Sequence, residues 1–193
     1  MSKAMTRLYK PILQSLNLTY PQYVVMLYCE SMKRYRGDVN LNKLSGVIIA
    51  MGGIVVYMVV KNNLTPKNLG VNNGKLSKMP NKPNAVSSQT DVKDKQFEAM
   101  EFKENLERSK EHIIKAIETY DNAKIVKNEN NYIYAVFTTG KMKYHDDVEF
   151  YFDESEKLIH VRSASRIGYS DMGLNRERYN KLKEFYYNEH LNK

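Results

Sequence analysis

The sequence predicts an α+β fold: a small antiparallel sheet of about four strands, flanked by an N-terminal and a C-terminal helix and preceded by a hydrophobic, transmembrane-like helix. Three observations predict it. The run Leu44–Val60 passes seventeen residues without a charge. Beyond residue 120, four segments combine strand-forming residues with turn signals at their ends. Apolar residues at helical spacing stand before and after these segments.

Composition favours a folded domain with its excess charge at one end. The 193 residues carry a net charge of +8, with 27% charged and 42% hydrophobic residues. Residues 1–60 hold 7 Lys and Arg against 2 Asp and Glu, whereas residues 61–193 hold 23 against 20. The larger part therefore has no strong electrostatic footprint for nucleic acid. Cys29 is the only cysteine, so a disulfide within the chain is excluded, and its apolar surroundings favour a buried small hydrophobe.

The run Leu44–Val60 predicts a transmembrane helix. A spanning helix needs about 20 apolar residues, with a range of roughly 17–25, so the run is at the short limit. It is apolar on all sides, whereas a surface helix shows a polar stripe. Gly46, Gly52 and Gly53 are tolerated better in a membrane helix than in a soluble one. The alternative is a buried core helix.

The charges beside this run predict its orientation. The fifteen residues before it carry four Lys and Arg, and the fifteen after it carry three. The positive-inside rule then places the N-terminus in the cytoplasm. We therefore expect a single-pass protein of the cell membrane, with the bilayer as the partner of Leu44–Val60 and the C-terminal domain outside the cytoplasm.

Residues 61–91 predict an extended linker, because they are rich in Asn, Pro, Gly, Ser and Lys. Turns are expected at "NNG" and "PNKPN". The α+β domain is predicted over residues 92–193, with "FEAMEF" as a candidate short strand. "AKIVK" and "YIYAVFTT" predict two strands separated by the turn "NENN".

Two amphipathic helices are predicted on either side of the strands. Asn105 is the candidate cap of the first, and Ser170 or Asp171 of the second. The apolar stripe of the first comprises Leu106, Ile113, Ile114, Ile117 and Tyr120, and that of the second Leu174, Tyr179, Leu182, Phe185 and Tyr186.

The stretch 144–176 predicts a hairpin crowded with charges. If residues 154–157 form its turn, Phe150 opposes Val161 and Glu149 opposes Arg162. Because strand residues alternate between faces, this register gathers apolar residues on one face and acids opposite bases on the other. The candidate ligand-binding residues lie on the charged face and in the loop after it: Asp147, Glu149, Arg162, Arg166, Asp171 and Arg176.

These charges have two interpretations. One is a cross-strand ladder of ion pairs, each worth about 0.2–1 kcal/mol. The other is a site for an anionic ligand, because arginines near a helix start attract anions. "HDD" at residue 145 is a weak metal signal, and no metal or cofactor is predicted. Ser163 and Ser165 have no base at a recognisable spacing, so no catalytic residue is assigned.

Four motifs carry a resemblance to a known family. "PNAVSSQ", "DDVEF", "VRSASRIGYSD" and "GLNRERY", in this order, resemble the family catalogued as domain of unknown function 1499, over roughly residues 64–189. The uncharged run with the segment after it resembles bacterial members that have a membrane anchor. Since no activity is established for the family, the resemblance implies no catalytic residues. It implies that the characteristic motifs contain Asp146, Asp147, Glu149, Arg162, Ser163, Ser165, Arg166, Asp171, Asn175 and Arg176.

Residues 1–30 resemble a different family. "LYKPILQSLNLTYPQYVVMLYCE" is similar to the N-terminal helices of MarR-type transcriptional regulators, especially the organic-hydroperoxide sensors, where this segment belongs to the dimerisation region. A winged helix-turn-helix should follow, but the uncharged run begins at Leu44 instead. We therefore interpret residues 1–35 as a truncated MarR-like helical segment, and no sequence-specific nucleic acid is expected as a partner.

The sequence thus favours a membrane-anchored binding or structural module without an established activity. One alternative is a MarR-type regulator, which a dimer that shifts DNA would support. The other is a hydrolase-like enzyme acting on an anionic or sugar-like substrate through the face of Asp147, Glu149, Arg162 and Arg166. Strongly perturbed carboxylate pKa values in a pocket at that face would support the enzyme.

Overall fold

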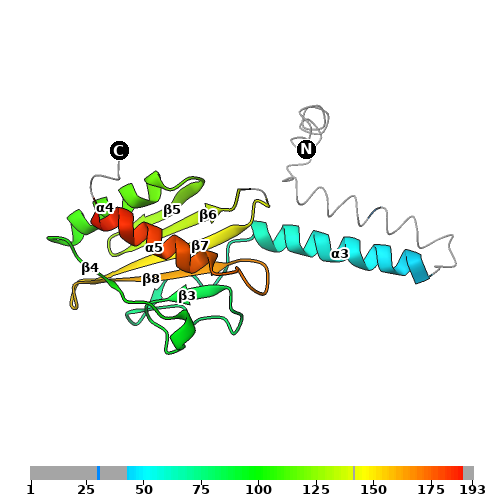
Figure 1. The fold of residues 1–193 in the computed structure, drawn as a ribbon, viewed down its shortest axis with the longest axis horizontal. Helices are drawn as coiled ribbons and strands as arrows, with labels where there is room; N and C mark the ends of the chain where they lie inside the picture. Colours follow the sequence, from blue (N-terminus) through cyan, green and yellow to red (C-terminus); the bar gives the residue numbers. More distant parts are fainter. Residues whose placement is uncertain (1–29, 31–42, 141, 189–193) are drawn as a thin grey trace, which may run out of the picture. The chain divides into compact units, whose positions relative to one another are not determined.

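The structure, a computed structural model, describes residue 30 and residues 43–140 and 142–188 (Figure 1). The chain forms two compact units, Met1–Leu64 and Thr65–Lys193. In the first unit the described part is essentially helix α3, Lys43–Asn63. The predicted MarR-like segment, residues 1–35, lies outside the described residues except for Glu30, and Cys29 lies outside them as well.

Helix α3 contains the whole uncharged run and extends past it at both ends. Its last residues, Lys61, Asn62 and Asn63, are polar. In the described part of the chain, no helix is long and apolar enough to cross a membrane. The helix itself is confirmed, whereas the prediction that Leu44–Val60 spans a bilayer is not.

The second unit is built on one antiparallel sheet of six strands, in the order β3-β8-β7-β6-β5, with β4 also paired to β8. The predicted α+β class is therefore confirmed, but the sheet has more strands than the predicted four. Of the two additional strands, β4 lies within the predicted candidate strand "FEAMEF", whereas β3 lies in the predicted linker. Both are short and pair with β8. The strands are β3 (Ala85–Ser87), β4 (Met100–Glu101), β5 (Ala123–Glu129), β6 (Tyr132–Thr138), β7 (His145–Asp153) and β8 (Leu158–Ser165).

The predicted linker, residues 61–91, is corrected by the structure, because part of it folds onto the sheet. Strands β1 (Val71–Asn72) and β2 (Lys75–Leu76) form a small hairpin. Its turn, Asn73–Gly74, has φ values of 50° and 73°, as the "NNG" signal predicts. Strand β3 lies in the same segment and is buried throughout. Contacts with distant strands keep this segment ordered. Its local composition has no strand periodicity and therefore resembles that of a linker.

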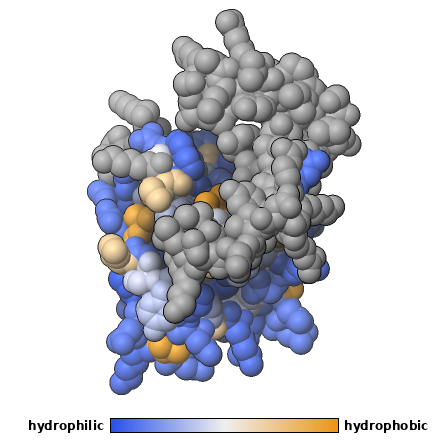
Figure 2. All heavy atoms as spheres, turned by 90° about the vertical axis from the view of Figure 1, so that its right-hand side faces the viewer, coloured by the Kyte–Doolittle hydropathy of each residue, from blue (hydrophilic) through white to orange (hydrophobic). Residues whose placement is uncertain are grey.

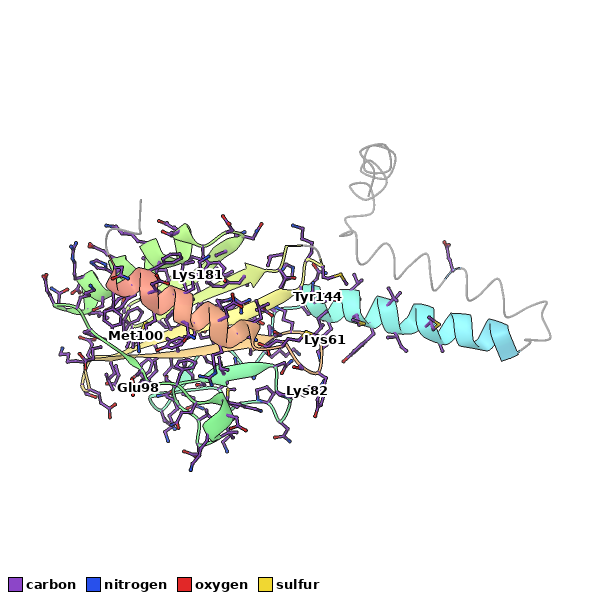
Figure 3. The ribbon with its side chains drawn as sticks, viewed as in Figure 1. Lys61, Lys82, Glu98, Met100, Tyr144 and Lys181 are labelled. Carbon is purple, nitrogen blue, oxygen red and sulfur yellow. The ribbon has the colours of Figure 1, made fainter. Side chains whose placement is uncertain are left out.

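Helices α4 (Leu106–Thr119) and α5 (Leu174–Tyr187) pack against one face of the sheet (Figure 1). Apart from Leu174, the residues of their predicted apolar stripes lie in or against the core, and Met100 of β4, labelled in Figure 3, is fully buried there. On the face that Figure 2 shows, most of the described surface is hydrophilic and apolar residues appear in separate patches. The core of the second unit comprises Met100, Ile113, Ala116, Ile117, Ile133, Ala135, Phe137, Val148, Phe150, Phe152, Ile159, Val161, Tyr179, Leu182 and Tyr186.

The register of β7 on β8 is the one that a four-residue turn predicts. Phe150 pairs with Val161, and Glu149 pairs with Arg162. The turn at residues 154–157 is held by Asp153, whose Oδ1 accepts hydrogen bonds from the backbone N–H groups of Ser155 and Glu156 at 2.9 and 3.2 Å. The alternation of the pleat then places acids and bases on the face away from α4 and α5.

Replacing Asn105 with alanine should lower the free energy of unfolding by about 1 kcal/mol. The Asn105 side chain accepts a hydrogen bond from the backbone N–H of Arg108 at 2.8 Å and so caps α4. Urea unfolding of Asn105→Ala measures the loss, and Asn105→Asp, which keeps the acceptor, is the matched control. Equal stability of Asn105→Ala and the wild type would contradict the cap.

Candidate functional site

The candidate residues Asp147, Glu149, Arg162 and Arg166 lie together on the sheet face opposite α4 and α5. Strand β7 provides the two acids, β8 provides Arg162, and Arg166 directly follows β8. The residues are not exposed: relative accessibility is 2% for Asp147, 0% for Glu149 and 5% for Arg162. The predicted cross-strand pairing of acid and base is confirmed for Glu149 and Arg162, but the pair is buried and not solvated.

Glu149 is held by three donors. Arg162 Nη1 donates to its Oε2 at 2.8 Å. The Tyr132 hydroxyl and the backbone N–H of Gly70 donate to Oε1 at 2.8 and 2.7 Å. Both carboxylate oxygens are thus bound, as a buried charge requires. Burial, and then the charge of Glu149, raise the pKa of Tyr132, so this hydroxyl stays protonated and donates.

Asp147 is bound in a fork by one arginine. Arg166 Nε donates to Asp147 Oδ2 at 3.0 Å, and its Nη2 donates to Oδ1 at 2.7 Å. The Tyr134 hydroxyl also donates to Oδ1, at 2.5 Å. Burial alone would lower the pKa of Arg166, but the hydrogen bonds and the charge of Asp147 raise it overall. This two-point geometry is the strong form of the arginine–carboxylate pair.

The charged face is buried by a segment from earlier in the chain. Leu76 of β2 forms an apolar cluster with Tyr132 and Tyr134, and Leu69, Val71 and Tyr151 pack against it. The hairpin β1–β2 therefore lies over the side chains that hydrogen-bond the two acids. The sequence alone did not indicate this, because the covering residues lie in the predicted linker.

A third buried ion pair lies on the opposite face, toward α5. Arg178 Nη2 donates to Asp146 Oδ2, and its Nη1 donates to Asn175 Oδ1 at 2.6 Å. Ser163 Oγ donates to the same Asn175 oxygen at 2.5 Å. The guanidinium also lies 5.2 Å from the ring centroid of Phe137. This group ties α5 to β7 and β8.

Sequence reasoning did not select Arg178. The sequence does contain a pattern that could have identified Arg178. Counted from Asn175, the residues Arg178, Tyr179 and Leu182 follow at three, four and seven positions, which places all four on one helical stripe. A charged residue on a stripe of buried residues is expected to have a buried partner. All four of these residues are buried in α5.

Two of the six candidates do not join the others. Asp171 accepts hydrogen bonds from the backbone N–H groups of Gly173 and Asn175 at 3.3 and 2.8 Å. The N-cap of α5 is Gly173, however, so the prediction that Ser170 or Asp171 caps this helix is wrong. Arg176 Nη2 donates to the carbonyl oxygens of Asp94 and Gln96 at 2.9 and 3.0 Å. Asp94 belongs to the short 3-10 helix η1, Lys93–Lys95. Both residues therefore organise the start of the helix and its neighbouring loop.

The remaining polar residues of the motifs are also engaged in structure. Asp146 and Asp147 are adjacent on β7, so they project to opposite faces, and each binds its own arginine. The weak "HDD" metal signal therefore does not correspond to a converging ligand set. His145 Nδ1 lies 3.1 Å from Thr138 Oγ1. Burial lowers the pKa of His145, and the charge of Arg166 lowers it further. Ser165 accepts from Asn175 Nδ2 at 3.0 Å.

The arrangement as a whole is a buried charge network with three arginine–carboxylate pairs: Glu149–Arg162, Asp147–Arg166 and Asp146–Arg178. Within the described residues, every carboxylate of this network is neutralised and hydrogen-bonded from inside the domain. Such a network can hold the hairpin β1–β2 and helix α5 on the sheet. It leaves no carboxylate of the network as a ready proton acceptor.

One comparison with known proteins gives a match. A family model described as "Protein of unknown function (DUF1499)" matches residues 75–185. No curated protein and no solved structure matches the chain. The matched range runs from β2 to α5 and contains all six members of the buried charge network.

Proposed function

The chain belongs to the DUF1499 family of proteins of unknown function, and from this premise we propose that it is a membrane-attached, non-catalytic module. Residues 44–60 attach it to the bilayer, and residues 65–193 form a binding or structural domain. The buried charge network holds that domain together and is not a reaction centre.

The observation that carries the attachment is the apolar surface of α3. Met51, Ile54, Val55 and Tyr57 have relative accessibilities of 62%, 59%, 59% and 61%. Contiguous exposed apolar surface of this kind marks an interaction site. Lipid fits it best, because a lysine stands at each end of the uncharged run and can reach the headgroup region.

The length of the run falls short of the full hydrocarbon thickness of a bilayer. Seventeen residues at a helical rise of 1.5 Å extend about 25 Å, against about 30 Å for the hydrocarbon core of a bilayer. The bias of four basic residues before the run to three after it favours a cytoplasmic N-terminus, with the domain on the other side.

The non-catalytic role follows from the pairing of the charges. A general base needs a carboxylate or imidazole poised to take a proton. Glu149, Asp147 and Asp146 are each bound by an arginine at 2.8 Å or less. Such pairing occupies the carboxylate oxygens, which suits a structural role.

Carbonate extraction of membranes tests the attachment. The full-length chain should stay in the membrane pellet at high pH. A charge near the centre of a membrane helix costs about 2.5–3.5 kcal/mol, so Ile54→Asp combined with Val55→Lys should move the chain to the supernatant. Leu64→Lys is the matched control, since Leu64 is 62% exposed but lies beyond the run, and it should leave the chain in the pellet.

A wild-type chain that stays in the supernatant as a folded monomer would overturn this proposal. The run would then pack within protein, as a core helix does.

A further inference from the structure

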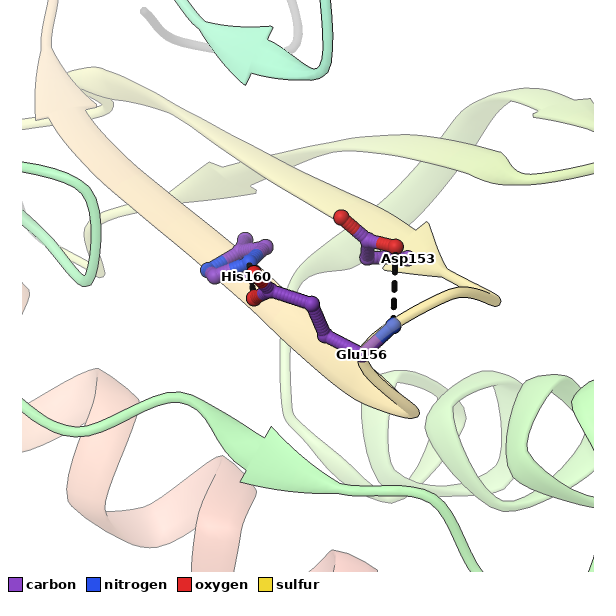
Figure 4. Close-up of side chains that lie close together, drawn as sticks. All are labelled: Asp153, Glu156 and His160. Carbon is purple, nitrogen blue, oxygen red and sulfur yellow. Dashed lines mark hydrogen bonds and ion pairs between the residues drawn. The ribbon is translucent and has the colours of Figure 1, made fainter.

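The turn between β7 and β8 gathers three potential metal ligands on one side. Asp153 ends β7, Glu156 lies in the turn, and His160 is the third residue of β8. One ligand atom from each lies within 4.8 Å of the others. The close-up in Figure 4 shows the Glu156 side chain directed toward the His160 ring, with Asp153 beside the turn. None of these residues belongs to the buried charge network.

Hydrogen bonds within the turn fix one carboxylate oxygen of Asp153 and do not use the other. Its Oδ1 accepts hydrogen bonds from Ser155 N, Ser155 Oγ and Glu156 N at 2.9, 2.6 and 3.2 Å. The described side-chain hydrogen bonds of Asp153 all end on Oδ1. The turn therefore sets the orientation of the carboxylate, and Oδ2 can bind a cation without breaking the turn.

His160 is the observation that points to a ligand independently of the two acids. Its relative accessibility is 9%, and its ring stacks on Tyr151 with centroids 6.0 Å apart and planes at 16°. Nε2 lies 3.8 Å from Glu156 Oε2, which is too long for a hydrogen bond. A nearly buried ring thus directs one nitrogen to the acids without a hydrogen-bond partner there.

The surroundings of the other ring nitrogen are compatible with the tautomer that a metal requires. His160 Nδ1 lies 3.3 Å from Ser88 Oγ, which accepts from Val161 N at 3.0 Å and lies 3.4 Å from Val161 O. When the hydroxyl donates to Val161 O, its oxygen accepts from both Val161 N and His160 Nδ1. Nε2 then carries the lone pair. A metal-bound histidine almost always has such an anchor on its second nitrogen.

We propose that Asp153, Glu156 and His160 bind one divalent transition-metal ion, with Zn²⁺ as the best-fitting species. One imidazole nitrogen and two carboxylate oxygens, with water in the fourth position, form an ordinary zinc coordination set. Mg²⁺ and Ca²⁺ prefer ligand sets made of oxygen alone.

The site closes by a small movement. Ligand atoms on a tetrahedral zinc ion lie about 3.4 Å apart, less than the present limit of 4.8 Å. The Glu156 side chain is 61% exposed, so it rotates toward the ion without disturbing the core. Binding would clamp the β7–β8 turn. This inference is independent of the proposed membrane attachment.

Isothermal titration of the full-length chain with ZnCl₂, after removal of metal with a chelator, tests the site. The wild type should bind one zinc ion, and Glu156→Gln should weaken binding by about tenfold or more. Glu154→Gln is the matched control, because Glu154 is exposed in the same turn but outside the cluster, and its affinity should be unchanged. MgCl₂ should give no saturable binding to the wild type.

The comparison of zinc binding between the two glutamate variants leaves the nearly buried His160 in place, because replacing His160 would disturb packing. Glu156→Gln should keep the circular dichroism and urea midpoint of the wild type, because the carboxylate is exposed. Absence of saturable zinc binding by the wild type would overturn the proposal. So would a Glu156→Gln variant that is folded and binds zinc as tightly as the wild type, or an equal loss in Glu154→Gln.

Discussion

Replacing Arg178 with alanine is expected to lower the free energy of unfolding by about 3–5 kcal/mol. Arg178 neutralises Asp146 and binds the side chains of Asn175 and Ser163. Its removal leaves the Asp146 carboxylate, at 1% accessibility, without its counter-ion. The buried charge then costs far more than the lost contacts alone. Urea unfolding, followed by far-UV circular dichroism, measures the loss.

Arg176→Ala is the matched control, because both arginines lie on α5 only two positions apart. Arg176 is half-buried and donates to two backbone carbonyls, and no buried carboxylate is among its partners in the described part of the chain. Its loss should cost about 1 kcal/mol. Similar losses for the two variants would mean that the Arg178–Asp146 pair contributes no more than a surface contact.

Breaking the pair between Glu149 and Arg162 should have an effect of similar size. Arg162→Ala and Glu149→Gln should each lower the free energy of unfolding by about 3–5 kcal/mol, since each leaves a buried group without its partner. The two residues touch at 2.8 Å, so the double variant should lose less than the sum, with a coupling energy of about 1–3 kcal/mol. Urea midpoints of the three variants complete the cycle.

An exposed ion pair of the same chain provides the control for this cycle. Arg108 and Glu111 lie 3.3 Å apart on α4, with side-chain accessibilities of 41% and 59%. Arg108→Ala should cost about 0.5 kcal/mol. Strictly additive losses for Glu149→Gln and Arg162→Ala would contradict their contact and the register of β7 on β8.

Local sequence determined the four long strands, the two helices on either side of them and the register of the central hairpin. A four-residue turn and strict alternation are sufficient to pair Glu149 with Arg162 and Phe150 with Val161, because the side chains of a strand repeat every two residues. Asn105 as a cap follows equally from short-range chemistry, since the donor that it satisfies lies three residues away. The spanning role of the uncharged run stays a prediction from composition.

Only the tertiary structure decided what the charges do. The backbone N–H that binds Glu149 belongs to Gly70, 79 positions earlier in the chain, in a segment whose composition resembles a linker. Arg178 meets Asp146 across 32 positions, through the packing of α5 on the sheet. Periodicity sorts residues onto faces, but it does not state which segment will cover a face. Whether another segment covers an ion pair decides how much the pair matters for the free energy of unfolding. An ion pair in water contributes little. A pair removed from water cannot lose one partner without leaving an uncompensated charge.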